Sequence, residues 1–246
     1  MQISQKRHWY ISPWGWPFLI IGVLLGGLLV LIGSRTAYYY WQIKTRGLEA
    51  MSLDFSQKLT LGGPISSAVA LPLVADTVSS DDPSFGNPRA KLTIVEFADF
   101  QCPYSKESSR VVRELALKYK DKINLIFRDF PLDTINKYAR SSAEAAECAA
   151  EQGKFWPFHD KLFAMSPALD ADSLKTAAIQ AGLDEKIFST CLGRPDIKKE
   201  VQVDYEDGLG AGIRGTPTFF INGVKVEGAI PKNIFEQIIQ RELINR

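Results

Sequence analysis

The stretch Leu92-Thr-Ile-Val-Glu-Phe-Ala-Asp-Phe-Gln-Cys-Pro-Tyr-Ser105 joins an apolar segment to a cysteine followed by a proline. Residues 92–97 are rich in β-branched and aromatic side chains, which predicts a short buried strand. Pro103 suits the first turn of a helix, where no backbone N–H is needed, so we expect a helix from Pro103 to about Lys120. Cys102 is therefore predicted to lie where a strand ends and a helix begins.

Downstream of this unit, residues 123–127 form a second apolar run that predicts another buried strand. A block of helices follows, with expected positions at 134–152, 154–165, 172–181, 184–192 and 195–208. Because parallel strands need a crossover, the first strand, helix and second strand are expected to form a βαβ unit.

The end of the chain has the pattern of a hairpin and a helix. Asn222-Gly223 separates Thr218–Ile221 from Val224–Val226 and is a strong hairpin signal. Residues 234–243 have helical apolar spacing. The order of these strands and helices along the chain predicts an α/β fold with a central mixed sheet. The fold would consist of a βαβ half followed by a ββα half, with a helical insertion at about 134–208 between them.

The N-terminal part of the chain carries an apolar segment. No charged residue occurs from Trp9 to Ser34, and aromatic residues flank this segment on both sides. A bilayer core needs about 20 apolar residues in a helix. We predict a short cytoplasmic tail and one transmembrane anchor in residues 1–41, a stalk or linker in 42–90, and the folded domain in 91–246. A cleaved signal peptide and a buried core helix are the alternatives.

Composition excludes some functions. The net charge is +1, which gives no electrostatic basis for a nucleic-acid partner. The chain has 2 histidines and 3 cysteines, without the spacing of a zinc site, so we expect no metal and no cofactor. In an oxidising compartment, three cysteines suggest one disulfide and one free thiol. We predict that Cys148 and Cys191, on two helices of the insertion, form that disulfide; two separate buried thiols are the alternative.

Cys102 and Glu96 are the first candidates for chemistry. Backbone N–H groups and the helix dipole at a helix N-terminus stabilise a thiolate, and Ser105 could donate a hydrogen bond to the sulfur. The alternative for Cys102 is a small structural core residue. A carboxylate inside an apolar strand is costly unless it has a role, so Glu96 could exchange the thiol's proton through water. The alternative is that Glu96 is a carboxylate near the end of the strand whose side chain reaches solvent.

Gly215-Thr-Pro-Thr218 places a proline at the start of a predicted strand, one of the few strand positions that tolerate proline. A cis Thr216–Pro217 bond would leave the backbone of Thr216 free to pair with an extended peptide.

Two other groups of residues are predicted to have no catalytic role. His159 is assigned to an aromatic core cluster rather than to a catalytic base, and Arg128 and Asp129 to a solvated or paired turn.

Several motifs together resemble the DsbA-like thioredoxin family of bacteria over about residues 82–245. In chain order they are Asp82-Pro83, Gly86-Asn-Pro88, Thr93-Ile-Val-Glu-Phe-Ala-Asp-Phe-Gln-Cys-Pro-Tyr104, Phe127-Arg-Asp-Phe-Pro-Leu132, Glu151-Gln-Gly-Lys-Phe-Trp156 and Gly215-Thr-Pro-Thr218. The resemblance implies a thioredoxin core with a helical insertion on the outer side of the cytoplasmic membrane. It also implies Cys102 as nucleophile, Glu96 as buried acid and Pro217 as the cis-proline beside the active site. We expect Pro103, Tyr104, Thr216 and Pro217 to form the active-site loop and to bind substrate.

Ser105 departs from the family, which usually has a second cysteine at this position. A lone Cys102 can form only mixed disulfides, because a serine hydroxyl is too weakly acidic for thiol–disulfide exchange. We therefore expect a membrane-tethered isomerase or monothiol reductase whose partners are extracytoplasmic proteins with cysteines or disulfides, small thiols or a membrane redox partner. Membrane lipid would contact the anchor. The alternatives are a non-catalytic peptide-binding or chaperone-like module, and an oxidase whose second cysteine was replaced by serine.

Overall fold

The structure is a computed structural model that describes residues 20–21, 23–27, 29–35, 78 and 81–244. The chain divides into two units, Met1–Pro64 and Ile65–Arg246. In the first unit the described residues are helical. Over the described positions, no helix combines the length and apolar composition needed to cross a membrane. The predicted anchor and stalk, 1–41 and 42–90, fall largely outside the described residues.

A five-stranded mixed sheet organises the second unit, in the order β1-β3-β2-β4-β5. Strands β2 and β3 are parallel and are joined through helix α3, whereas β4 and β5 form an antiparallel hairpin. This arrangement confirms the predicted α/β core with a βαβ and a ββα half. The bounds are β1 Ser84–Gly86, β2 Leu92–Ala98, α3 Pro103–Lys118, β3 Ile123–Asp129, β4 Thr218–Ile221 and β5 Val224–Glu227.

Strand β1 corrects the predicted boundary between linker and domain. The sequence suggested a linker up to residue 90, but Ser84–Gly86 pairs antiparallel with β3, with Ser84 opposite Ile126. Three residues are too few to show a strand periodicity, so only pairing with β3 defines this edge strand. Gly86 adopts a φ of 103°, and a Cβ atom there would lie 2.3 Å from the carbonyl oxygen of Ile123, so glycine is needed.

The predicted helical insertion is present and lies between β3 and β4. One boundary was wrong, because α4 begins at Ala139 rather than near residue 134. Before α4, the side chain of Asn136 and the backbone N–H of Tyr138 bond to Asp99 and Gln101 instead of continuing a helix. The helices are α4 Ala139–Ala150, α5 Phe155–Met165, α6 Ala171–Gln180, α7 Glu185–Cys191, α8 Pro195–Gly210 and, after the hairpin, α9 Lys232–Ile244.

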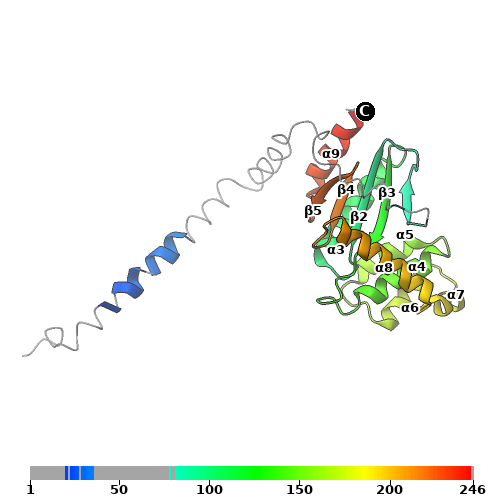
Figure 1. The fold of residues 1–246 in the computed structure, drawn as a ribbon, viewed down its shortest axis with the longest axis horizontal. Helices are drawn as coiled ribbons and strands as arrows, with labels where there is room; N and C mark the ends of the chain where they lie inside the picture. Colours follow the sequence, from blue (N-terminus) through cyan, green and yellow to red (C-terminus); the bar gives the residue numbers. More distant parts are fainter. Residues whose placement is uncertain (1–19, 22, 28, 36–77, 79–80, 245–246) are drawn as a thin grey trace, which may run out of the picture. The chain divides into compact units, whose positions relative to one another are not determined.

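Three apolar clusters hold the layers together. One joins the sheet to α3 and α9, a second joins the opposite sheet face to the segment after α8, and a third fills the helical insertion. Figure 1 shows α9, in red, close to the β4–β5 hairpin, whereas α4, α6 and α7 form a separate group in green and yellow. The ends of β2 and β3 contribute Ala98, Phe100 and Phe127 to the insertion's core, so the insertion packs against that end of the sheet.

The disulfide prediction is confirmed. Cys148 on α4 and Cys191 on α7 are bonded, with their Cα atoms 5.7 Å apart and both side chains buried. The bond joins two helices of the insertion. It leaves Cys102 as the free cysteine of the chain.

Candidate active site

Cys102 is the N-cap residue of α3, and Pro103 is the first helical residue. The carbonyl of Cys102 accepts a hydrogen bond from the backbone N–H of Lys106 at 3.0 Å, which closes the first helical turn. The sulfur therefore lies beside the free N–H groups of a sixteen-residue helix, where negative charge is stabilised. The local sequence had predicted this position.

The loop before β4 meets Cys102 directly. The Thr216–Pro217 peptide bond is cis, and the Cys102 thiol donates a hydrogen bond to the carbonyl oxygen of Thr216 at 3.2 Å. Strand pairing explains the meeting, because Phe97 near the end of β2 lies opposite Thr218 at the start of β4. Cys102 is only 6% exposed, so its side chain is largely covered by the surrounding protein.

The rest of the Cys-Pro-Tyr-Ser loop divides into a buried and an exposed part. Ser105 is fully buried, and its hydroxyl oxygen accepts a long hydrogen bond from the backbone N–H of Asp99 at 3.5 Å. Among the described residues, Ser105 donates no hydrogen bond to the Cys102 sulfur, contrary to the expectation from the sequence. Tyr104 is 63% exposed and Pro103 is also exposed. These two residues form the accessible surface beside Cys102.

Glu96 lies inside β2, opposite Phe127 and Phe219 of the neighbouring strands. It is 1% exposed, so it does not reach solvent, and its Oε1 atom has no hydrogen-bond partner. Burial raises the pKa of Glu96 to about 8, although the positive charge of Arg113 on α3 opposes this rise. A carboxyl group with such a pKa can gain or lose a proton near neutral pH.

Three polar residues around the active-site loop were missed by the sequence interpretation. The Asp99 carboxylate accepts hydrogen bonds from the backbone N–H groups of Gln101 at 2.7 Å and Leu132 at 2.9 Å. The Gln101 side chain donates to the carbonyl of Pro167, and Lys106 donates to that of Ser166. The Ser166–Pro167 bond is also cis. Polar residues next to Cys102 were the available sequence signal, but their partners lie far along the chain.

His159 belongs to the core, as its aromatic neighbours had suggested. It is fully buried, its Nδ1 lies 2.9 Å from the Asp160 carboxylate, and its ring packs between those of Phe127 and Phe163. Burial is the main influence on this side chain and lowers the pKa of His159. The neutral imidazole therefore fills the interface between α5 and the sheet.

The predicted turn at Arg128 and Asp129 is instead the buried end of β3. Arg128 donates hydrogen bonds to Asp204 at 2.7 Å and Asp207 at 2.9 Å, so the predicted pairing is correct and the predicted solvation is wrong. Both carboxylate oxygens of Asp129 are buried without a hydrogen-bond partner. Burial, and then the negative charges of Glu147 and Asp204, raise the pKa of Asp129 well above its ordinary range.

Comparison with known proteins agrees with this geometry. A family model described as thioredoxin matches residues 79–241. The chain is 38% identical over 149 residues to Na(+)/H(+) antiporter NhaA 3 of Salinispora tropica, which covers 61% of this chain and 22% of the antiporter. It is 32% identical to Na(+)/H(+) antiporter NhaA of Herminiimonas arsenicoxydans, covering 57% of this chain and 22% of that protein. The chain thus spans about a fifth of the length of these curated relatives.

Solved structures share the fold. A thioredoxin-like oxidoreductase from Silicibacter pomeroyi DSS-3 has a TM-score of 0.61 and 26% identity, covering 68% of this chain and 95% of that one. The catalytic domain of Proteus mirabilis ScsC has a TM-score of 0.64 and 24% identity, with coverages of 71% and 97%. The thiol-disulfide exchange protein alpha-DsbA2 of Wolbachia pipientis has a TM-score of 0.64 and 20% identity, with coverages of 70% and 93%. This chain belongs to the thioredoxin family whose model matches residues 79–241.

Proposed function

We propose that this chain is a thiol–disulfide exchange protein that acts through the single cysteine Cys102. One observation carries the proposal: the Cys102 sulfur lies at the N-terminus of α3 and 3.2 Å from the carbonyl of Thr216, next to cis-Pro217. A helix N-terminus favours the thiolate, which is the reactive form in exchange. The similar solved structures include a thiol-disulfide exchange protein of Wolbachia pipientis, which supports the same chemistry.

The reaction needs one thiolate and an external thiol. The Cys102 thiolate attacks one sulfur of a substrate disulfide, forming a Cys102–substrate disulfide and releasing the other substrate sulfur as a thiolate. A second thiolate, from the substrate or from a small thiol, then attacks the mixed disulfide and releases Cys102. When the second thiolate comes from the substrate, the substrate disulfides are rearranged without net oxidation or reduction. When it comes from a small thiol, the released substrate sulfur is bonded to that small thiol. A second small thiol must then attack this bond to give the reduced substrate and the disulfide of the small thiol.

Glu96 is the proposed proton acceptor and donor for this cycle. Its pKa of about 8, raised by burial, allows both protonation states near neutral pH. It lies on β2, the strand that leads directly into the Cys102 loop. Pro103, Tyr104 and Thr216 are proposed to contact the substrate peptide, because the first two are exposed beside Cys102 and the third adjoins its sulfur.

The proposed location is the outer side of a bacterial cytoplasmic membrane. The uncharged segment from Trp9 to Ser34 supports a single anchor at the N-terminus, and the disulfide between Cys148 and Cys191 supports an oxidising compartment for the C-terminal domain. Substrates would then be extracytoplasmic proteins with cysteines or disulfides. A reporter fused after residue 50 tests the orientation: activity on the cytoplasmic side would contradict it.

Trapping of mixed disulfides tests the central proposal. The full chain should react with iodoacetamide below about pH 7 faster than a model thiol, whose thiolate is scarce at that pH. Mass spectrometry of membranes should find Cys102 joined to cysteine-containing proteins, and Cys102→Ala should abolish these adducts. Reaction no faster than the model thiol, with no adducts, would contradict the proposal.

Ser105 provides a second test. Ser105→Ala should keep the trapped adducts, because exchange through one thiolate does not use the hydroxyl. Ser105→Cys should add a resolving thiol and shorten the lifetime of the mixed disulfides. If the protein is instead a non-catalytic peptide-binding module, Cys102→Ala will capture the same partners as the unchanged chain.

A further inference from the structure

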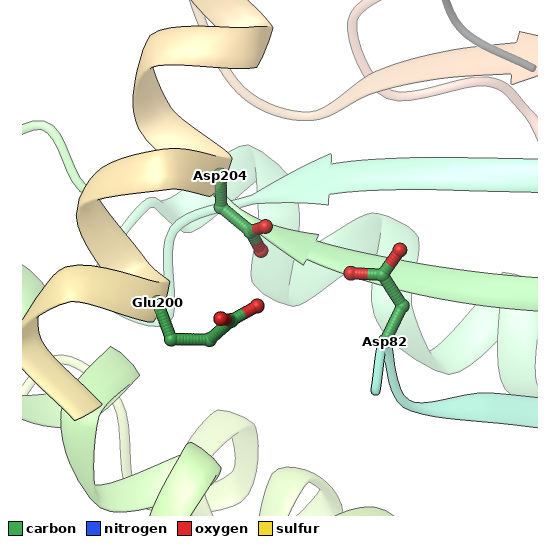
Figure 2. Close-up of side chains that lie close together, drawn as sticks. All are labelled: Asp82, Glu200 and Asp204. Carbon is green, nitrogen blue, oxygen red and sulfur yellow. The ribbon is translucent and has the colours of Figure 1, made fainter. Parts of the chain in front are cut away.

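The acidic cluster in Figure 2 has its counter-charge within the protein. Glu200 and Asp204 on α8 and Asp82 just before β1 direct their carboxylates toward one another. The guanidinium of Arg128 lies 3.3 Å from Asp82 and 2.7 Å from Asp204. Burial raises the pKa of both Asp204 and Glu200, which favours their neutral forms. These side chains therefore compensate one another.

A different group of charged residues connects the interior of the domain with solvent. Asp160 on α5 is half-exposed, and its Oδ1 atom lies 2.9 Å from Nδ1 of His159 and 3.2 Å from Nε of Arg113 on α3. Asp160 and Arg113 line a groove of about 430 Å³ between the two helices. The His159 side chain is buried, so this group reaches from the groove into the protein. The other charged residues of the groove are Lys106, Arg110 and Glu114.

Three buried polar atoms between the sheet and these two helices have no hydrogen-bond partner. They are Oε1 of Glu96, Nη1 of Arg113 and Nε2 of His159. Phe127 is paired with Glu96 in the β2–β3 ladder, so both side chains emerge on the same face of the sheet, and the Phe127 ring lies 5.2 Å from that of His159. Trp156 packs against both His159 and Arg113. Buried polar atoms nearly always have a partner, so these three require one.

The protonation states of Glu96 and His159 are complementary. Burial lowers the pKa of His159, so its ring is neutral and carries one N–H. The Asp160 carboxylate can only accept, so Nδ1 of His159 donates to it and Nε2 is left as an acceptor. Burial raises the pKa of Glu96 to about 8, so at neutral pH this carboxyl group offers an O–H donor. A water between Glu96 and His159 would complete both bonds.

We propose that His159 and Asp160 carry protons between Glu96 and the solvent of the groove, through one bridging water. The proposal rests on the thiol–disulfide exchange proposed for Cys102. After Cys102 has given its proton to Glu96, the carboxyl group passes a proton through the water to Nε2 of His159. The Nδ1 proton leaves through the Asp160 carboxylate to solvent, and the ring changes from one neutral tautomer to the other. Arg113 positions Asp160 for this step.

The route also runs inward, which closes the cycle. When Cys102 is released from a mixed disulfide as a thiolate, a proton enters through Asp160 to Nδ1 of His159. The Nε2 proton then passes through the water to Glu96, which restores the first tautomer and allows Glu96 to protonate the thiolate. Each direction moves one proton and leaves no net charge on the buried imidazole. His159 and Asp160 thus act on the reaction only through Glu96.

Infrared spectroscopy after a pH jump tests the route on the full chain in detergent. The protonated carboxyl group of Glu96 absorbs apart from carboxylates, and Glu96→Gln identifies its band by removing it. After a jump from about pH 6 to about pH 9.5 the band should disappear, and His159→Phe, which keeps an aromatic ring, should slow its loss at least about tenfold. Asp160→Asn should slow it similarly, and this variant alters a half-exposed side chain rather than the core.

Two further variants separate proton transfer from packing. Phe163→Leu is the matched control, because the Phe163 ring lies 4.9 Å from that of His159 and lines the groove but carries no proton. It should release the Glu96 proton as fast as the unchanged chain. In His159→Gly, added imidazole should restore the rate, which a purely structural role of the ring would not produce.

Equal rates of proton release in His159→Phe, Asp160→Asn and the unchanged chain would overturn the proposal. Equal slowing in Phe163→Leu and His159→Phe would also overturn it, as would the absence of any effect of imidazole on His159→Gly. These rates do not depend on the reactivity of Cys102. Slowed release in the His159 and Asp160 variants of a chain whose Cys102 does not exchange would refute the proposed function and leave the proton route in place.

Discussion

Replacing Glu96 with glutamine is expected to change how stability depends on pH. Burial raises the pKa of Glu96 from its ordinary 4.5 to about 8. Between these values the folded protein holds a proton that the unfolded chain has lost. A raised carboxyl pKa therefore lowers stability as pH increases through this window. Each pKa unit corresponds to about 1.4 kcal/mol, so full ionisation of Glu96 costs about 5 kcal/mol of folding free energy.

The measurement compares the free energy of unfolding of the two proteins at two pH values. Urea unfolding at about pH 5 and about pH 8.5 should show that the unchanged chain loses about 4 kcal/mol more than Glu96→Gln across this interval. All other titrating groups are shared by the two proteins, so the difference isolates position 96. The sign follows from burial, which disfavours the charged form.

Glu107→Gln is the control, because Glu107 is exposed on α3. It should follow the unchanged chain at both pH values. A difference below about 1 kcal/mol between Glu96→Gln and the unchanged chain would mean that the pKa of Glu96 is not strongly raised. Its proposed role in proton exchange near neutral pH would then lose its support.

Three other changes are expected to lower stability, each measured by urea unfolding. Replacing Cys148 and Cys191 by alanine opens a disulfide of sequence separation 43, which should cost about 4 kcal/mol in the loop-entropy model. Arg128→Met removes the cation from buried carboxylates and should cost about 3–5 kcal/mol. Gly208→Ala places a Cβ atom 2.6 Å from the ring of Phe130, and the resulting overpacking should cost about 1–3 kcal/mol despite the better helix propensity of alanine.

Each of these expectations has a control or an outcome that would contradict it. A reductant should destabilise the unchanged chain and leave the stability of the double alanine variant the same. A reductant that leaves the unchanged chain equally stable would contradict the contribution of the disulfide. Gly215→Ala is the control for Gly208→Ala, because a Cβ atom at Gly215 would have no neighbour within 4 Å. A stabilised Gly208→Ala variant would show that the ring of Phe130 moves away without cost. An unchanged free energy of unfolding in Arg128→Met would contradict its role as the buried counter-charge.

Local sequence patterns were sufficient to predict most of the strands, helices and turns of the fold. The apolar run of β2, the proline at the start of α3 and the Asn222-Gly223 turn each specify a conformation through neighbouring residues. Asn222 and Gly223 indeed have positive φ values of 48° and 83°, as a tight hairpin requires. These signals act over a few residues, so they can be recognised before any tertiary contact is known.

The sequence predicted which residues form the candidate site, but it predicted few of the contacts that surround them. Cys102 and Pro217 follow from local patterns and from the family resemblance. The coverage of the sulfur by Thr216 depends instead on the pairing of β2 with β4. The supporting contacts of Asp99 and Gln101 also depend on segments distant in the sequence.

The sequence by itself determined the strand–cysteine–helix unit, the hairpin and the helical insertion, because periodicity and turn chemistry are local properties. Only the tertiary structure decided that Ser84–Gly86 is an edge strand and that Arg128 and Asp129 are buried. It alone brought Asp82 beside the acids of α8. These features depend on pairing and burial between distant segments, and burial determines the energy of a charge more than the identity of its neighbours in the chain does.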